Sequence, residues 1–523
     1  MLFLGSIQRN LRVTCFSFLI IGVADQVLAK DRLLQMSWWL HEGEHFSVVT
    51  NMPDKGDDVV ADLELFRAVV LRFTGFKAVE DRLPTRAVIF AKKSEFARIV
   101  DRASTLGYTS TTLRSNRMVS SGGKLNVEQR HIVFHEYIHY LLRSATNDNH
   151  PSWYDEGLAE MLSTVYERNG QVFVGSAPDV HIRFLNSNQL QMPAGSFVHT
   201  DDLSNWHPLK VSAFYATSWA MVNYIYADKT GERAEMLSDY LARLRRAEPR
   251  EAAFEQAFDM QPRGLVRRSR RYLSRRNRAF LQYPRDSFTI HTETTRRKLS
   301  KEEVAYELAY LAMFSNTELA RKLVEEILQE DPDNASMRMM LAVTYQADEE
   351  YQRGIEIARA SLSLANQKGV RDVLLEIDLA DMLMVWNRDA CARKEADHQV
   401  PARHREGDEK DVKQDSAETC RARYVEAKEA YLRGLAIEPN NPEVRAGLAW
   451  ALLKLEQELG QALRHIEFAL DYQPWSPTLQ YRAGMIHKGL DQRDLAMKRL
   501  RKALYWAKDG DLREDAAAAL AEF

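Results

Sequence analysis

The sequence predicts an α+β domain followed by an all-α region of helical repeats. Between about residues 30 and 285, short strand-like runs such as Phe46–Thr50 and Ala87–Phe90 alternate with helical stretches such as Val59–Phe73, a pattern typical of α+β domains. From residue 302 to residue 523 the pattern is helical and small residues recur with a period near 34, which indicates a repeat architecture. The 523 residues are enough for two or three domains with their own cores.

The composition is that of an ordinary soluble protein, with 45% hydrophobic and 28% charged residues and a net charge of −3. This balance gives no reason to expect a nucleic-acid partner. The basic stretch Arg267–Arg278 departs from it. We interpret this stretch as a solvated helix face, and contact with an anionic lipid or partner is the alternative. Membrane association is compatible with the sequence but not required by it.

The first 29 residues have the pattern of a signal peptide. Arg9 and Arg12 precede the apolar run Val13–Ala24, and Val27–Ala29 provides a small-residue exit. The apolar run is too short to span a bilayer comfortably, although an uncleaved anchor is an alternative. We therefore expect residues 1–29 to be removed and the mature chain to be exported, to the periplasm or outside the cell.

One predicted helix, Val127–Leu142, carries a zinc-binding pattern. His135 and His139 are four residues apart, so both imidazoles leave the same helix face, and Glu136 lies beside them. A chain with 14 His and 74 acidic residues is expected to contain the string H-E-x-x-H at most roughly 0.05 times by chance. An accidental match is therefore rare but not excluded by the string alone. We expect His131, one turn earlier, to be a polar wall of the site.

The segment Pro151–Glu160 (PSWYDEGLAE) opens a second helix and supplies two glutamates. A catalytic zinc needs three protein ligands and an open position. Together, HEYIH and WYDEGLAE resemble the gluzincin metallopeptidases, whose aminopeptidase and peptidase-MA-like members carry HExxH followed by a W-x-x-E-G-x-A-type helix. The resemblance implies a zincin-like metallopeptidase domain over residues 30–285, with one Zn2+ per chain bound by His135, His139 and Glu156.

The resemblance also implies roles for the neighbouring glutamates. Glu136 would accept a proton from the zinc-activated water and pass it to the leaving amine. Glu160 would orient a ligand histidine. Only 16 residues separate His139 from Glu156, slightly fewer than in the aminopeptidases, so Glu160 is an alternative third ligand. A solvated pair four residues apart on a helix is the remaining interpretation of Glu156 and Glu160.

Other parts of the site follow less directly. Gluzincins often stabilise the oxyanion with Tyr or His, and Tyr215 is the candidate here, with His150 or His207 as substitutes. In this family an edge strand ahead of the HExxH helix binds the substrate backbone, and Met118–Ser120 occupies the corresponding place. The resemblance extends over about Phe46–Tyr272. No motif for capturing a free amino terminus is recognisable, so endopeptidase action is expected.

After a predicted linker, residues 286–301, the chain reads as a helical solenoid. Two columns of small residues keep one phase, and turn prolines follow members of the first column after twelve residues. The first column is Ala320, Gly354, Ala427, Ala462 and Ala496, the second is Ser361, Gly434, Ala469 and Ala503, and the prolines are Pro332, Pro439 and Pro474. Small side chains let two helices approach closely. The pattern over Glu302–Phe523 resembles the tetratricopeptide repeat (TPR), which implies binding of protein partners.

One repeat contains an insertion. Residues 392–419 are almost wholly charged and polar, and we expect them to form a loop between the helices Arg371–Trp386 and Ala422–Ile437. Cys391 and Cys420 stand at its ends, where antiparallel helices bring the chain together. A disulfide between them would stabilise the fold by roughly 3–4 kcal/mol in the chain-entropy model. Two unrelated thiols are the alternative.

The sequence thus predicts an exported zinc metallopeptidase whose repeats recruit protein substrates or partners. One alternative is a TPR protein-binding scaffold with an inactive or non-proteolytic zinc domain. Another is zinc-dependent hydrolysis of a non-peptide bond, which the ligand set does not distinguish from proteolysis.

Overall fold

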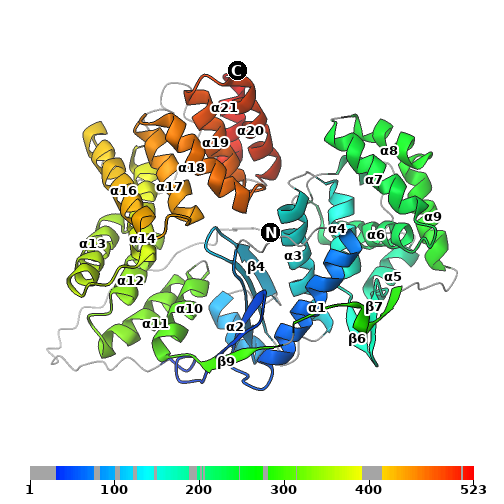
Figure 1. Cartoon of the computed structure of the whole chain (residues 1–523), viewed down its shortest axis with the longest axis horizontal. Coiled ribbons are helices and arrows are strands. Elements are labelled where there is room, and N and C mark those ends of the chain that lie inside the picture. The colour runs from blue at the N-terminus through cyan, green and yellow to red at the C-terminus, as the bar shows by residue number, and fades with distance from the viewer. Residues whose placement is uncertain are drawn as a thin grey trace, which may run out of the picture.

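The computed structural model contains a sheet-bearing N-terminal part and a helical C-terminal part (Figure 1). It describes residues 31–75, 83–100, 107–121, 127–146, 150–187, 197–200, 203, 206–246, 248–274, 281–291, 293–313, 315–391, 415–507 and 510–523. The predicted signal peptide and residues 392–414 of the predicted insertion lie outside these ranges. Within them, no helix combines the length and apolarity that crossing a membrane requires.

A six-stranded sheet forms the centre of the N-terminal part, in the order β4-β5-β3-β2-β1-β9. Its strands are β1 (Trp39–Glu42), β2 (Phe46–Thr50), β3 (Thr85–Phe90), β4 (Gly107–Thr111), β5 (Asn116–Ser121) and β9 (Thr295–Lys298). Strands β2, β3 and β5 are mutually parallel, whereas β1 and β4 run antiparallel to their neighbours. The central strands are buried on both faces: β2 and β3 are rich in apolar residues, whereas β5 buries Asn116, Arg117, Ser120 and Ser121 beside Met118 and Val119.

Both faces of the sheet are covered by helices. Alternate residues such as Val48 and Ile89 pack against α1 (Gly56–Thr74) and α3 (Val127–Thr146). Their neighbours Val49 and Val88 face the opposite way. There they pack against α2 (Lys93–Val100) and the first repeat helices, α10 (Lys301–Ala312) and α11 (Thr317–Glu330). The sheet and the first repeat therefore share one hydrophobic core.

The prediction that residues 286–301 form a linker is wrong. Residues 295–298 form β9, which pairs antiparallel with β1 so that Trp39 lies opposite Lys298. The four residues of β9 (TRRK) are exposed, because this strand lies at the edge of the sheet. A short edge strand without an apolar face gives no alternating hydrophobic pattern, so its sequence resembles a loop.

The strand predicted to bind the substrate backbone does not lie at the edge of the sheet. Met118–Ser120 lies in β5, which is paired on both sides, with β3 and with β4. The edge strand is instead β4, the other member of this hairpin. Its sequence, GYTST, is polar apart from the tyrosine and only partly buried, so it has little of the pattern by which strands are recognised.

The rest of the N-terminal part is mainly helical. It contains α4 (Ser152–Leu162), α5 (Asp179–Asn186), α6 (Pro208–Tyr226), α7 (Glu232–Arg245), α8 (Arg250–Phe258), α9 (Pro262–Ser274) and a small sheet of β6 (Tyr166–Arg168), β7 (Gln171–Val174) and β8 (Leu281–Pro284). In α9, Leu265 and Val266 are buried while Arg267 and Arg268 are exposed. This part of the basic stretch is a solvated helix face.

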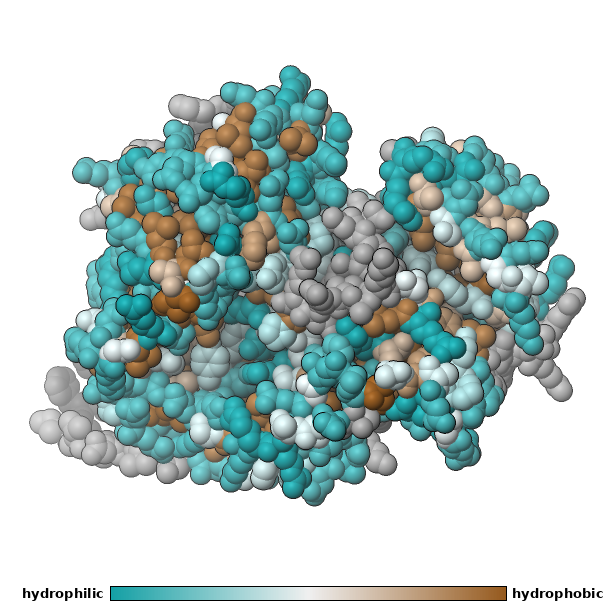
Figure 2. Space-filling model, viewed as in Figure 1, coloured by the Kyte–Doolittle hydropathy of each residue, from teal (hydrophilic) through white to brown (hydrophobic). Residues whose placement is uncertain are grey.

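The C-terminal part is a helical repeat region of the TPR type. In the described ranges, five helix pairs are followed by α21 (Asp511–Ala521). The pairs are α10 and α11, α12 (Ala335–Ala347) and α13 (Tyr351–Gln367), α14 (Val373–Cys391) and α16 (Ala417–Ile437), α17 (Pro442–Lys454) and α18 (Leu459–Tyr472), and α19 (Pro477–Gly489) and α20 (Arg493–Trp506). Hydrophilic side chains cover most of the face shown in Figure 2, with hydrophobic ones gathered in places over these helices.

The small residues of the repeat pattern are buried where helices meet. At Gly354, for example, an added Cβ atom would lie 2.9 Å from the carbonyl oxygen of Ala342 and 2.8 Å from the Met382 side chain. The three turn prolines lie between one helix pair and the next. The period in the sequence therefore reflects helix–helix packing, as predicted.

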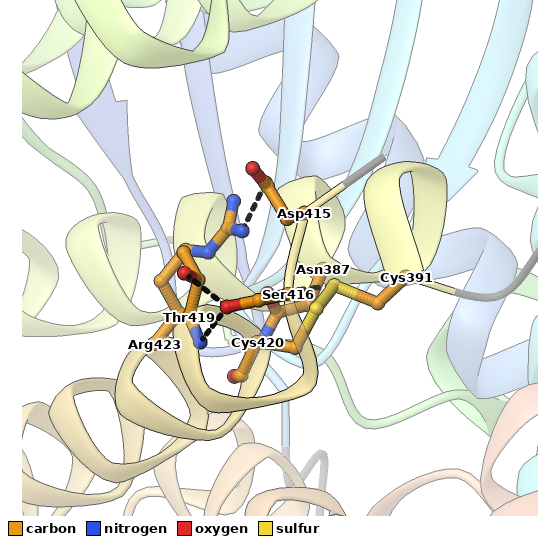
Figure 3. The surroundings of a disulfide bond; sticks show 7 residues. All are labelled: Asn387, Cys391, Asp415, Ser416, Thr419, Cys420 and Arg423. Atoms are coloured by element: carbon orange, nitrogen blue, oxygen red, sulfur yellow. Dashed lines mark hydrogen bonds and ion pairs between the residues drawn. A yellow bond between two sulfur atoms is a disulfide. The ribbon is translucent and has the colours of Figure 1, made fainter. Parts of the chain in front are cut away.

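A disulfide joins Cys391 at the end of α14 to Cys420 in the first turn of α16, with their Cα atoms 6.3 Å apart (Figure 3). The Asn387 side chain donates a hydrogen bond to the Cys420 carbonyl at 2.8 Å. Ser416 caps α16 by accepting a hydrogen bond from the Thr419 amide at 3.1 Å. Residues 417–419 are therefore helical, and the insertion is shorter at this end than predicted, because Ser416 starts the helix.

Candidate metal centre

Helices α3 and α4 bring three predicted ligands together. The Nε2 atoms of His135 and His139 are 3.1 Å apart. The Oε2 atom of Glu156 lies 3.2 Å from the first and 3.5 Å from the second. The orientation of α3 follows from its apolar face, where Phe134 stacks on Phe66 of α1 with ring centroids 3.9 Å apart. The two histidines consequently face α4.

These three side chains fit a zinc ion. Zinc–ligand bonds of about 2.0–2.1 Å in a tetrahedron place ligand atoms about 3.3–3.4 Å apart, close to the separations among His135, His139 and Glu156. Buried polar atoms normally have a hydrogen-bond partner, yet Glu156 Oε2 makes no hydrogen bond with the described residues. A cation bound between the three ligand atoms would give this oxygen the partner that it lacks. Two imidazoles and one carboxylate are also a known donor set of catalytic zinc.

The electrostatics of the cluster favour a positive charge. Burial by itself raises the pKa of the Glu156 carboxyl, but His139 and His135 outweigh it and hold that pKa well below its usual range. Burial lowers the pKa of His135, but its contacts with the carboxylates of Glu156 and Glu160 raise it well above its usual range. One partly buried carboxylate, Glu156, and one buried carboxylate, Glu160, thus flank the imidazoles, and a bound cation would offset their charge.

Glu160 lies behind His135, one helical turn after Glu156. Its Oε1 atom is 3.4 Å from His135 Nδ1. This ring nitrogen points away from the three-atom cluster, by which we mean His135 Nε2, His139 Nε2 and Glu156 Oε2. Its Oε2 atom is 3.0 Å from His131 Nε2 and 2.7 Å from His181 Nε2. His131, Glu160 and His135 Nδ1 form a second group of possible ligand atoms, but their contacts with one another are those of a hydrogen-bonded network. Ser163 extends this network, with its hydroxyl 2.9 Å from His131 Nδ1.

His181 was not among the predicted site residues. It lies on α5, where packing against α6 places its ring 5.8 Å from that of Trp219. Its sequence distance of 21 residues from Glu160 has no helical or strand periodicity, so only tertiary packing brings the two together. The sequence offered only one signal for it, a further histidine within about 20 residues of the end of α4.

Glu136, the predicted base, and Tyr215, the predicted oxyanion donor, lie on different helices. Glu136 is exposed on α3, between the two histidines. The Tyr215 ring, on α6, lies 6.0 Å from the His135 ring. Burial, with the charges of Glu156 and other glutamates, raises the pKa of the Tyr215 hydroxyl. Tyr215 therefore keeps its proton and is able to donate a hydrogen bond.

The two substitutes for Tyr215 have other contacts. His150 Nδ1 lies 3.2 Å from Asp155 Oδ1 at the start of α4. His207 is the N-cap of α6, where its side chain accepts a hydrogen bond from the Leu209 amide at 3.3 Å. Among the described contacts, neither histidine meets the three-atom cluster, whereas Tyr215 lies beside it.

Gly157 fixes the distance between α4 and α6. An added Cβ atom would lie 2.5 Å from the carbonyl oxygen of Ser218 and 2.6 Å from the Val222 side chain. We expect Gly157→Ala to lower the free energy of unfolding by about 1–3 kcal/mol, as overpacking does, and to weaken zinc binding because Glu156 would shift. Denaturant unfolding measures the first effect. The control is Gly460→Ala, where a Cβ atom meets nothing within 4 Å. Equal stability of both variants would contradict tight packing at Gly157.

No protein-family model matches the sequence, and the search of curated proteins finds no match. Among solved structures, the TPR protein TTC0263 of Thermus thermophilus aligns with 42% of this chain and 99% of its own length, at 18% identity and a TM-score of 0.31. YrrB, a TPR protein with an unusual peptide-binding site, covers 41% of this chain and 91% of its own, at 18% identity and a TM-score of 0.27. MamA covers 36% and 82%, at 16% identity and a TM-score of 0.25. Each similarity extends over less than half of this chain.

Proposed function

We propose that this chain is a zinc metallopeptidase whose helical repeats bind protein substrates or partners. The observation that carries the proposal is the convergence of His135 Nε2, His139 Nε2 and Glu156 Oε2 at zinc-ligand separations. Glu136 is exposed immediately beside them. This combination matches what the gluzincin-like motifs imply about the site.

Each side chain around the cluster then has a role. Bound zinc would lower the pKa of water towards about 7 and polarise a substrate carbonyl. Glu136 accepts a proton from the attacking water and delivers it to the leaving amine. Tyr215 donates a hydrogen bond to the developing oxyanion. The Glu160 carboxylate lies 3.4 Å from His135 Nδ1 and so favours the proton on that nitrogen, which leaves Nε2 unprotonated and facing the cluster.

The edge strand β4 is the proposed site for the substrate backbone. It pairs with β5 on one side and has no strand partner on the other among the described residues. It also packs beside α3, the helix that carries the two histidines. An extended peptide that pairs with this edge would run through the site, and such β-augmentation recognises the middle of a chain as readily as its end. This supports endopeptidase action.

Export is part of the proposal. Residues 1–29 have the pattern of a signal peptide, and a Cys391–Cys420 disulfide suits an oxidising compartment. Both features support a periplasmic or secreted location.

The second candidate is a protein-binding scaffold with an inactive or non-proteolytic zinc domain. It requires only the repeat region, whose paired helices and buried small residues are those of a TPR-type solenoid. The presence of all three ligand side chains and of Glu136 favours the peptidase.

The zinc content of the purified full-length protein tests the proposal. We expect about one zinc per chain in the wild type and its loss in His135→Ala, because one of three ligands is removed. The matched control is His291→Ala, since His291 is exposed and distant from the cluster in sequence. Wild-type protein that binds no zinc, even after reconstitution, would exclude the peptidase and leave the scaffold.

A further inference from the structure

The β4–β5 hairpin reaches from the sheet into the repeat region (Figure 1). Its turn is held by Thr112, whose amide donates to the Ser115 carbonyl at 3.0 Å. The Thr112 hydroxyl accepts a hydrogen bond from the Arg114 amide at 3.2 Å. The turn presents Leu113, which packs against the core of the repeats, and Arg114 beside it.

Arg114 contacts a carboxylate on each of two repeat helices. One Nη atom meets Asp378 of α14, and Nε lies 2.6 Å from Oε2 of Glu443 at the start of α17. The three side chains are only 14–19% exposed. Burial lowers the pKa of Arg114, but Asp378 and Glu443 outweigh this and raise it well above its usual range. We call Arg114, Asp378 and Glu443 the arginine clamp.

The clamp places two carboxylates on one guanidinium. Burial raises the pKa of the Glu443 carboxyl to about 7 even with Arg114 in contact. Two buried carboxylates without a cation would be strongly unfavourable, and a single guanidinium reaches both because its donors are arranged in a fork. Close to the turn, Arg117 of β5 adds a contact to the first repeat, with Nε 3.1 Å from Oε1 of Glu307 on α10.

The repeats also contact α3, the helix that carries the two histidines. The Trp475 ring, after α18, lies 5.9 Å from the ring of Tyr140 on α3. The guanidinium of Arg143, in the last turn of α3, lies 5.6 Å from the ring of Trp506 on α20. The repeat region therefore touches both elements that flank the proposed substrate path, α3 and the β4–β5 hairpin.

We propose that Arg114 is a positioning residue through which the repeats hold the edge strand β4 at a fixed place beside α3. The hairpin belongs to the sheet through β5, which pairs with β3, but its strand β4 is supported by a strand on one side only. Anchoring its tip limits the motion of β4. The consequence for catalysis rests on the proposed peptidase function, whereas the consequence for the mobility of β4 does not.

Hydrogen exchange in the zinc-loaded full-length protein tests the clamp. We expect Arg114→Ala to speed exchange of the β4 amides about tenfold or more, while α3 amides and zinc content stay unchanged. Arg114→Lys, which keeps the charge, should recover part of the protection. The control is Arg359→Ala, which removes an exposed ion pair between α13 and α16, with Glu426. If Arg114→Ala fails to fold, Glu443→Gln provides a milder loss of the same contact.

Kinetics with an extended peptide test the positioning role. We expect Arg114→Ala to raise KM about tenfold with a smaller change in kcat, because strand pairing and not the reacting groups is affected. Unchanged β4 exchange in Arg114→Ala, or exchange that rises equally in α3, would overturn the inference. Wild-type protein that cleaves nothing would refute the peptidase proposal, and the exchange experiment would still decide whether the clamp holds β4.

Discussion

Glu136→Gln is expected to slow the hydrolysis of an unstructured protein by about 10²–10⁴-fold, the range that general acid–base catalysis contributes. Glutamine has almost the same shape but cannot accept a proton. The Glu136 side chain is exposed, so the change removes no buried contact. His135, His139 and Glu156 are untouched, and zinc content should stay at one per chain. The defect should therefore lie in the chemical step.

Cleavage rate, zinc content and melting temperature of the same preparations measure this effect. Glu318→Gln is the control, because Glu318 is exposed on the repeat helix α11. A Glu136→Gln variant that cleaves at the wild-type rate would remove Glu136 from the role of base. An inert variant with intact zinc can also retain its substrate, and comparing the proteins that copurify with wild-type and variant chains would identify what is cut.

Glu156 and Glu160 should differ in their effect on zinc affinity. Glu156→Ala removes a side chain whose oxygen faces both histidine Nε2 atoms. Binding free energies of about 10–16 kcal/mol for structural zinc sites with four ligands correspond to roughly 3 kcal/mol per ligand, which is more than 100-fold in affinity. Glu160→Gln leaves the three atoms in place and should weaken binding about 10–100-fold, as the loss of a ligand-orienting carboxylate does.

Competition with a chelator of known affinity measures both dissociation constants. Asp179→Asn is a suitable control, since Asp179 is an exposed acid on α5, close in sequence to His181. The variant that loses more zinc affinity identifies the third zinc ligand. If Glu160→Gln loses more affinity than Glu156→Ala, then Glu160 is the ligand.

Features that depend on local periodicity could be predicted from the sequence. The spacing of His135 and His139 is a property of one helix, so their common face follows directly. The small residues of the repeats, such as Ala320 and Gly354, are spaced by the repeat itself. The contact between α3 and α4 could be predicted only with the help of a family resemblance, because residue spacing within one helix does not say where a second helix packs.

Features that depend on pairing between distant segments could not be predicted. His181 meets Glu160 only because α5 packs on α6. The strand β9 has no apolar pattern and is defined by its partner β1. Arg114 lies 264 residues from Asp378 and 329 residues from Glu443. A single arginine in a polar turn is ordinary on a protein surface, and only its partners make it a buried ion.

The pairing of β9 with β1 has a consequence for how the chain acquires its structure. Trp39 lies opposite Lys298, so the last edge of the sheet cannot close until almost 300 residues have been synthesised. The helices that carry the three-atom cluster end at Leu162, long before that point. If the chain is exported from its amino terminus, the cluster emerges on the far side of the membrane while β1 still lacks its partner β9. Contacts between such distant segments form slowly. Strand β9 completes the sheet, and the first repeat, which follows it in the chain, covers one face. Maturation of the sheet-bearing part is thereby coupled to the arrival of the repeats.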